Sequence, residues 1–431
     1  MAGTKPWTRK GTFMLTLPAY DGLDPFEDPL DRLLAQIAIE LQLPPSLFDQ
    51  AGDRYAGVRK RLEGTSAFAG LIEHFYPQGS MAIDATISTR GTDDEYDLDI
   101  VAQLGGYFRE MAPLAVLIEL EKALVNYPVQ RITRQTRCVT LHYADKMHLD
   151  ITPGIRVADT TERESYIMHA KGPKPSHDDR LVDMNAYAFA CWYQERTPLE
   201  RRLAKSFDRH WRGIDELMAK DEAEVDDVPD QTHFSVKNTA TLALQLIKRF
   251  RNIRYADYSG RIPPSVVLSY YAALAARPNM RLSEMVIRIA KWILRDIEAA
   301  SISGKRLHVA NPMCPSDVFT DRWPESVAQQ NRFANHLKDL VNGLEAMAKM
   351  TMAADAIGEW LRKMFGDRVV TKAADSTAIR LGAAIQNSRQ SYSRKGRLLV
   401  PGTGRSLSAA VAPLVGPATS AKAHTFFGVR F

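Results

Sequence analysis

Two aspartates on one apolar strand constrain this chain more than any other feature. Asp97 and Asp99 lie in the segment Tyr-Asp-Leu-Asp-Ile-Val at 96–101, and side chains two residues apart on a strand point to the same face. Two carboxylates held this close repel each other unless a cation lies between them. Carboxylate oxygens suit a hard divalent cation, so the pattern predicts a Mg²⁺ site on one face of a sheet, with Mn²⁺ as the alternative ion.

Two further segments complete the pattern. Gln78 ends the expected strand 71–78, and Gly79 and Ser80 open a short helix or turn, where backbone N–H groups and a hydroxyl can bind phosphate oxygens. A third acid, Asp150, lies on a later apolar strand. Each feature alone is common on ordinary strands and turns. In this order, and among apolar neighbours that make unpaired charge costly, the three predict a site for two metal ions and a nucleoside triphosphate.

The chain resembles the polymerase-β-like nucleotidyltransferases and, in more detail, the bacterial cGAS/DncV-like nucleotidyltransferases (CD-NTases) of CBASS antiphage systems. The resemblance spans roughly residues 30–365. It is carried by Tyr76–Ser80, Glu95–Ile100, His148–Pro153, Leu244–Arg251, Pro263–Ser265, Asn311-Pro312 and Asp317–Trp323. Val318 departs from the asparagine found at its position in relatives, so the last block is left out of the predicted site.

The resemblance implies an α+β fold, in which a polymerase-β-like nucleotidyltransferase core with a small mixed sheet is joined to an all-α C-terminal lobe. The active site would lie in the cleft between them. Two Mg²⁺ ions would be held by the catalytic residues Asp97, Asp99 and Asp150, and Asp150 would either accept the proton of the attacking hydroxyl or only tune the metal. The implied phosphate contacts are Gln78, Gly79, Ser80, Lys248 and Ser265. Without the resemblance, Lys248 would be interpreted as part of a solvated helix face.

Hydrophobic periodicity divides the chain into four parts. These are an N-terminal segment (1–27), a nucleotidyltransferase core with bracing helices at 28–41 and 46–62 (28–182), a helical lobe (183–365) and a basic tail without periodicity (366–431). Within the core, residues 156–182 are expected to form a polar surface loop. The expected helices of the lobe span 183–196, 199–220, 236–254, 265–276 and 282–300, with two more within 324–365.

Charge and composition exclude several classes of protein. The net charge is +5, but the chain has no acid after Asp375, and the eight cations that follow leave the remainder at about −3. A basic groove for duplex DNA is therefore not expected. No run approaches the roughly 18 apolar residues of a membrane span, and no apolar signal segment opens the chain, so a cytoplasmic protein without a membrane partner is predicted. The three scattered cysteines predict neither disulfides nor a zinc finger.

Two weaker candidates lie outside this pattern. Arg90, in the loop 88–94, is either a phosphate ligand or, as such charges more commonly are, a solvated loop residue. His169, His177 and Asp178 carry metal-ligating groups, but their spacing is too irregular for a metal site.

The resemblance implies an enzyme that makes a cyclic di- or trinucleotide second messenger, containing adenine, from NTPs that include ATP. The product would act on a downstream effector in antiphage defence. Two alternatives remain open: a template-independent RNA 3′-end nucleotidyltransferase, and a catalytically silent nucleotide-sensing scaffold. The acid-free tail ends in Phe-Phe-Gly-Val-Arg-Phe, which predicts a docking segment for a regulatory partner, either a HORMA protein or a ubiquitin-like ligation protein.

Overall fold

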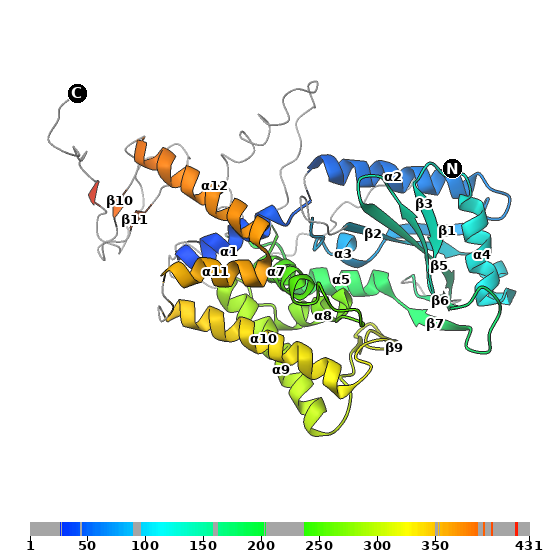
Figure 1. The fold of residues 1–431 in the computed structure, drawn as a ribbon. Coiled ribbons are helices and arrows are strands. Elements are labelled where there is room, and N and C mark those ends of the chain that lie inside the picture. The colour runs from blue at the N-terminus through cyan, green and yellow to red at the C-terminus, as the bar shows by residue number, and fades with distance from the viewer. Residues whose placement is uncertain are drawn as a thin grey trace.

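The computed structural model describes most of the chain. The described residues are 26, 28–43, 45–88, 96–157, 163–201, 203, 237–349, 352, 354–386, 391–392, 398–399 and 419–420. Figure 1 shows two lobes, a sheet domain on the right and a helical lobe on the left. Among the described helices, none combines the length and the apolar character that crossing a bilayer requires.

The sheet domain is built on seven strands. They are β1 (Ile72–Pro77), β2 (Tyr96–Leu104), β3 (Arg131–Arg134), β4 (Val139–His142), β5 (Met147–Arg156), β6 (Ser165–His169) and β7 (Arg180–Met184). The strand order is β1-β2-β5-β4-β3, and β6 pairs with β5 and with β7. The β2–β5 pair is parallel, and its register places Asp99 opposite Asp150. Adjacent strands lie about 4.8 Å apart, so the two acids are close neighbours.

Alternation along β2 decides which face carries the acids. Leu98 and Ile100 are buried, whereas Asp97 is exposed and Asp99 is half-buried. The buried side chains join a hydrophobic core with α2 (Pro45–Glu63), α4 (Pro113–Leu124) and the 3₁₀ helix η1 (Gly106–Glu110). Burial of each large aliphatic side chain stabilises the fold by about 1.5–3 kcal/mol. A one-residue slip of register would expose this set, so the pattern fixes the acids on the opposite face.

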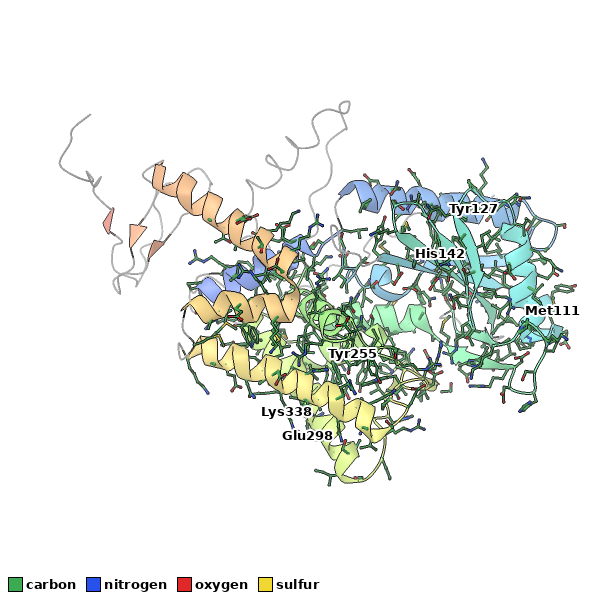
Figure 2. The ribbon with its side chains drawn as sticks, in the orientation of Figure 1. Met111, Tyr127, His142, Tyr255, Glu298 and Lys338 are labelled. Carbon is green, nitrogen blue, oxygen red and sulfur yellow. The ribbon has the colours of Figure 1, made fainter. Side chains whose placement is uncertain are left out.

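The helical lobe is organised around α7 (Thr239–Arg254), in which every residue from Thr239 to Arg251 is buried. The other elements are α5 (Ala186–Arg196), α8 (Ser265–Ala275), α9 (Leu282–Ile302), α10 (Val327–Ala348), α11 (Ala354–Phe365), α12 (Asp367–Gln386) and the hairpin β8 (Ala310–Asn311) and β9 (Cys314–Val318). Figure 2 shows Tyr255, which follows α7, inside this lobe, and Glu298 and Lys338 on its outer side. The last two residues form an ion pair of 2.9 Å between α9 and α10.

The structure corrects four sequence predictions about the elements. Helix α1 (Pro29–Glu40) contacts α7, α9 and α12 and belongs to the helical lobe, so of the two predicted bracing helices only α2 packs on the sheet. The segment 156–182 contains β6 and the start of β7 and is not a simple loop. The lobe predicted to be all-α carries the β8–β9 hairpin. The predicted loss of regular structure from residue 366 is wrong over 367–386, which form α12.

The reason for the last correction lies in three small apolar residues. Val369, Val370 and Ala373 are buried in the core of the helical lobe, and their spacing places them on one face of a helix. Beyond α12 the structure describes three short strands, β10 (Ser391–Tyr392), β11 (Leu398–Leu399) and β12 (Thr419–Ser420), joined in the order β11-β10-β12. The rest of the predicted tail, the N-terminal segment up to residue 25 and most of the predicted helix 199–220 lie outside the described residues.

Candidate active site

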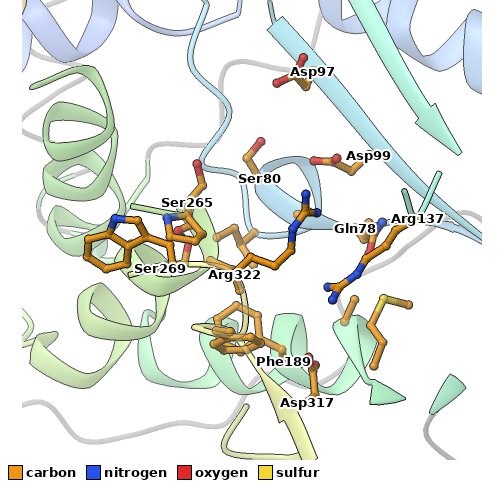
Figure 3. A pocket seen from close by; sticks show the side chains of 18 of the residues that line it. Gln78, Ser80, Asp97, Asp99, Arg137, Phe189, Ser265, Ser269, Asp317 and Arg322 are labelled. Carbon is orange, nitrogen blue, oxygen red and sulfur yellow. The ribbon is translucent and has the colours of Figure 1, made fainter. Parts of the chain in front are cut away.

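A cavity of about 590 Å³ lies between the sheet domain and the helical lobe. Figure 3 shows Asp97, Asp99 and Gln78 on one side of it and Ser265 and Ser269 on the other. Seven of the predicted site residues line this cavity, namely Gln78, Gly79, Ser80, Asp97, Asp99, Lys248 and Ser265. The eighth, Asp150, is the ladder partner of Asp99 on β5. The structure therefore brings all eight predicted residues to one place in the fold.

The segment after β1 is locked against the strand that carries the acids. The backbone N–H of Gln78 donates to the carbonyl of Asp99 at 2.8 Å, and the side-chain amide of Gln78 donates to the hydroxyl of Thr152 at 3.1 Å. Gly79 opens the four-residue helix α3 (Gly79–Ala82) with a φ of 60°, a left-handed conformation that glycine adopts without steric cost. Ser80 is therefore held beside the carboxylates.

Asp99 is a costly carboxylate in this environment. Burial, together with the charges of Asp97 and Asp150, raises its pKa to about 8, whereas Lys248 opposes the shift. Three acids on adjacent strands repel one another, and a divalent cation is the usual means of relieving such repulsion. The donor set of three carboxylates therefore fits Mg²⁺ or Mn²⁺ in its chemistry.

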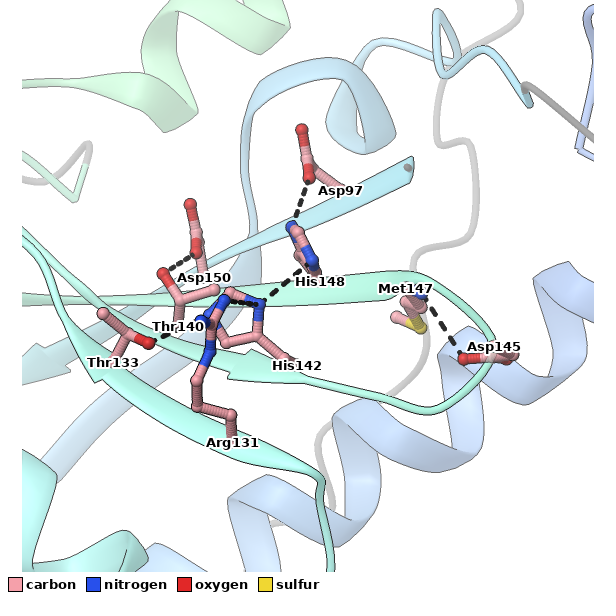
Figure 4. A network of polar contacts seen from close by, with 9 residues as sticks. All are labelled: Asp97, Arg131, Thr133, Thr140, His142, Asp145, Met147, His148 and Asp150. Atoms are coloured by element: carbon pink, nitrogen blue, oxygen red, sulfur yellow. Dashed lines mark hydrogen bonds and ion pairs between the residues drawn. The ribbon is translucent and has the colours of Figure 1, made fainter. Parts of the chain in front are cut away.

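The carboxylates do not converge on one point. Asp97 lies 3.7 Å from Nδ1 of His148, and Asp150 accepts a hydrogen bond of 2.5 Å from the hydroxyl of Thr140, as Figure 4 shows. Within the described part of the chain, no three His, Cys, Asp or Glu side chains are grouped as a metal cluster. Binding of one metal ion by all three carboxylates would therefore need rotation of Asp97 and Asp150 toward Asp99.

A pair of histidines lies behind Asp97. His148 contacts His142 through ring nitrogens 3.0 Å apart, and the hydroxyl of Thr133 lies 3.1 Å from the other ring nitrogen of His142. This chain of contacts supports Asp97 from the side (Figure 4). His148 was not predicted as a site residue, although it lies two residues before Asp150 and so on the same face of β5.

Lys248 faces the acids from the helical lobe. Its side chain is buried, and Nζ donates to the carbonyl of Ala85 at 2.8 Å. Burial and the nearby Arg251 lower its pKa to about 7, against the opposing effect of Asp99. Arg249 and Arg251 of the same helix are also buried, so the alternative of a solvated helix face does not apply to these three cations. One of them, Arg249, is structural, since its Nε donates to the carbonyl of Phe365 at 2.9 Å.

Arg251 is a second cation that the sequence analysis did not assign to the site. Its guanidinium donates to the carbonyl of Pro263 at 2.7 Å and to the hydroxyl of Ser265 at 3.0 Å. Ser265 is the first residue of α8, so the start of this helix is fixed next to a buried positive charge. A helix N-terminus and a guanidinium both favour an anion, which makes this wall a suitable place for phosphate groups.

The far wall of the cavity is tied to the start of α5 through Asp317, on β9. Its carboxylate accepts hydrogen bonds from the backbone N–H of Asn185, at 3.2 Å, and from the side chain of Asn311, at 2.9 Å. Val318 and Arg322 also line the cavity, and Arg322 is labelled in Figure 3. Arg90 lies outside the described residues. His169, His177 and Asp178 form no metal cluster in the described structure.

Comparison with known proteins gives consistent relationships. The family model described as Second Messenger Oligonucleotide or Dinucleotide Synthetase domain (SMODS) matches residues 30–168. The chain is 50% identical over 416 residues to the cyclic dinucleotide synthase CdnG of Bradyrhizobium diazoefficiens. The matched region covers 94% of this chain and 96% of that protein. It is 25% identical over 363 residues to the c-di-GMP synthase of Roseivirga ehrenbergii, and that matched region covers 81% of this chain and 87% of that protein.

A solved structure shares the fold. The Bradyrhizobium diazoefficiens CD-NTase CdnG in complex with GTP matches with a TM-score of 0.71 and 50% sequence identity, covering 82% of this chain and 99% of that chain. The similarity thus includes both the sheet domain and the helical lobe.

Proposed function

This chain belongs to the CD-NTase family of nucleotidyltransferases, and we propose that it joins two nucleoside triphosphates into a cyclic dinucleotide with release of pyrophosphate. The observation that carries the proposal is the cavity between the lobes. Three carboxylates on the parallel strands β2 and β5 approach it from one side, and Lys248, Arg251 and the N-terminus of α8 face them from the other. This arrangement suits a metal-assisted reaction of a triphosphate.

The first step consumes one triphosphate and one ribose hydroxyl. The hydroxyl oxygen of the acceptor nucleotide attacks the α-phosphorus of the donor, a new P–O bond forms, the α–β phosphoanhydride bond breaks, and pyrophosphate leaves. The hydroxyl proton passes to Asp150 or to water. The product is a linear dinucleotide that retains one 5′-triphosphate. A second, intramolecular attack closes the ring and releases the second pyrophosphate.

The residues of this chain position the reacting groups. Ser80 and the backbone N–H groups at the start of α3 would hold the phosphates on the sheet side, and Lys248 and the start of α8 would hold them on the other side. Fixing the phosphates in line with the attacking oxygen supplies most of what phosphoryl transfer needs from a protein. Asp97, Asp99 and Asp150 would bind two Mg²⁺ ions, or Mn²⁺, which when bound acidify the attacking hydroxyl and offset the charge of the leaving pyrophosphate.

We propose GTP as one of the substrates. Support comes from the relative that shares half of its residues with this chain, whose structure is a complex with GTP, and from the name of the second relative, a c-di-GMP synthase. The adenine preference expected from the sequence stays a prediction, as does the antiphage role of the product. A dinucleotide is preferred over the trinucleotide alternative because both relatives are named for dinucleotides.

Product analysis tests the proposal. The purified chain is incubated with all four labelled NTPs and either Mg²⁺ or Mn²⁺, and phosphatase-resistant products are identified by mass. A cyclic dinucleotide containing guanine is expected, and Asp97→Ala should yield none. Elongation of added RNA would instead favour the 3′-end nucleotidyltransferase, and unchanged triphosphates with both metals would favour the silent scaffold.

A further inference from the structure

A second, basic recess adjoins the cavity between the lobes. It has a volume of about 300 Å³ and shares three lining residues with the cavity, namely Arg261, Asp321 and Arg322. Both lobes contribute to it, because His169, Lys171, Asp178 and Arg180 come from the β6–β7 region and Arg306 and Glu325 from the helical lobe. A volume of this size lies at the lower end of the range for small-ligand pockets.

The acids of the recess are already engaged. Asp321 pairs with Arg137. Glu325 forms an ion pair with Arg261 at 2.9 Å and also accepts a hydrogen bond of 2.9 Å from Gln329. The carboxylate of Asp178 lies 3.3 Å from Nε2 of the neighbouring His177, on the chain's surface. Asp321 and Glu325 are thus paired with arginines, whereas Asp178 has only a histidine beside it and Asp321 also acts on the neighbouring Arg322.

Four cations of the recess form no ion pair within the described residues. Arg180 and Arg306 donate to backbone carbonyls, at 3.2 Å to Asp178 and at 3.3 Å to Pro324. Within the described residues, neither of these arginines, nor Lys171 or Arg322, lies within ion-pair distance of a carboxylate. A recess lined by five lysine and arginine side chains and three acids is suited to a ligand with several negative charges.

Two neighbouring groups respond to this positive field. The pKa of His169 is lowered to about 4, mainly by burial and further by Arg137, Arg180 and Arg322. The pKa of Arg322 itself is lowered, first by burial and then by Arg261 and Arg137. The recess therefore favours the neutral histidine and binds anions more readily than cations.

We propose that this recess holds the 5′-triphosphate of the acceptor nucleotide while its ribose hydroxyl lies in the cavity. The proposal rests on the proposed synthesis of a dinucleotide. That reaction uses the triphosphate of the donor at the carboxylates, and the acceptor carries a second triphosphate that needs a separate place within one nucleotide length. The shared wall of Arg261, Asp321 and Arg322 makes the recess a direct neighbour of the cavity that the carboxylates line. After the first bond forms, the triphosphate leaves the recess for the carboxylates.

Acceptor discrimination tests the assignment. The donor is a 2′,3′-dideoxynucleoside triphosphate, which has no ribose hydroxyl and so cannot act as an acceptor. The acceptor is either GTP or GMP. The mixed linear dinucleotide cannot be cyclised, so its rate of formation measures the first step alone. For the unmodified chain, kcat/KM should favour GTP over GMP by about tenfold or more, since removal of one charge-assisted hydrogen bond weakens binding by about that factor. The double variant Lys171→Gln/Arg306→Gln removes two recess cations that do not line the cavity. It should raise KM for GTP about tenfold and leave KM for GMP unchanged.

The matched control removes two charges elsewhere. Arg59→Gln/Lys338→Gln takes one cation from α2 and one from α10, and it should keep the preference for GTP. An unchanged preference in the recess variant would overturn the assignment. An equal fall in kcat with both acceptors would also overturn it, because that result identifies the recess as an exit for pyrophosphate.

A binding measurement separates this proposal from the proposed function. Inorganic tripolyphosphate is titrated calorimetrically in EDTA into the unmodified chain, the recess variant and the control variant. A Kd raised about tenfold in the recess variant alone supports a polyphosphate site, and equal Kd values oppose it. If the unmodified chain makes no dinucleotide from any NTP, the synthase proposal fails, and this titration still decides whether the recess binds polyphosphate.

Discussion

The Cα of Gly79 lies so close to the carboxylate of Asp99 that a Cβ at position 79 would overlap its Oδ2. The φ of 60° at Gly79 adds a second restriction, since L-residues adopt this conformation only with strain. Glycine therefore allows the start of α3 and the strand of acids to meet. Any larger residue must displace either the carboxylate or the backbone that would bind phosphate.

Gly79→Ala should lower kcat/KM for dinucleotide synthesis by at least about 100-fold, because small displacements of positioning groups carry penalties of that order. The fold should persist, since the change lies at the edge of a cavity. Steady-state kinetics and circular dichroism check both statements. Gly52→Ala is the control, because a Cβ there meets nothing within 4 Å, and wild-type activity with a slightly higher melting temperature is expected. Equal kinetics for the two variants would contradict the contact.

The raised pKa of Asp99 predicts how stability changes with pH in metal-free protein. Its pKa is about 8 in the fold, against an ordinary value of 3.8, so the folded state favours the protonated form. The stabilisation from that form is complete below about pH 4 and is lost as the pH rises to about 8. Asp99→Asn does not ionise. In EDTA its melting temperature relative to wild type should therefore rise between pH 4 and 8 and stay constant above pH 8.

Activity provides the second measurement for the same variant. Asp99→Asn should abolish synthesis with either metal at every pH, and Asp97→Ala should do so as well, because each removes a carboxylate from the predicted metal site. A melting difference that does not change with pH would contradict the buried, repelled state of Asp99. Synthesis at the wild-type rate by either variant would show that the substituted aspartate is not part of the active site.

Lys248→Met tests the cation opposite the acids. We expect KM for the donor triphosphate to rise about tenfold and kcat to fall, since a lysine charge on a polyphosphate contributes to binding and to the departure of pyrophosphate. Arg254→Gln, on the same helix but paired with Asp339 at 2.8 Å, should leave KM unchanged. Wild-type kinetics for Lys248→Met would show that Lys248 does not bind the triphosphate and that its role is limited to the hydrogen bond with the carbonyl of Ala85.

Local patterns predicted the acidic part of the site from sequence. The period of two along a strand places Asp97 and Asp99 on one face, and the apolar residues between them specify the buried face. The order of the three segments predicted that Asp150 joins the same site, but the parallel pairing that brings it beside Asp99 joins segments about 50 residues apart, and neither segment specifies it. The splaying of the carboxylates toward His148 and Thr140 depends on cross-strand contacts that no single segment contains.

The cavity wall opposite the acids was less predictable, because it depends on which faces of α7 are buried by other helices. Three cations within four residues normally indicate a solvated helix face. Lys248, Arg249 and Arg251 are nevertheless buried, because α7 is surrounded by other helices. The apolar residues around the whole circumference of α7 were a usable signal. The contact of Arg251 with Ser265 spans 14 residues and a loop, and helical periodicity contains no information about such a contact.

The location of α1 gives the last prediction. Asp31 is fully buried, and its carboxylate accepts from Nε of Arg281 at 2.7 Å and from the backbone N–H of Ser283 at 2.8 Å. Ser283 lies in the first turn of α9, so one carboxylate of α1 satisfies an otherwise unpaired N–H of a helix 250 residues later. This contact ties α1 to the helical lobe and not to the sheet.

Asp31→Ala should therefore lower the free energy of unfolding by about 2–3 kcal/mol, since it leaves the buried N–H of Ser283 without its acceptor and removes one of the two carboxylates paired with Arg281, the other being Asp28. Urea denaturation followed by tryptophan fluorescence measures the loss. Asp53→Ala, which removes an exposed acid from α2, should change stability by less than about 0.5 kcal/mol. Equal midpoints for the two variants would show that α1 contributes little to the helical lobe. Asp31→Asn, which keeps one acceptor oxygen but loses the charge, should fall between Asp31→Ala and wild type.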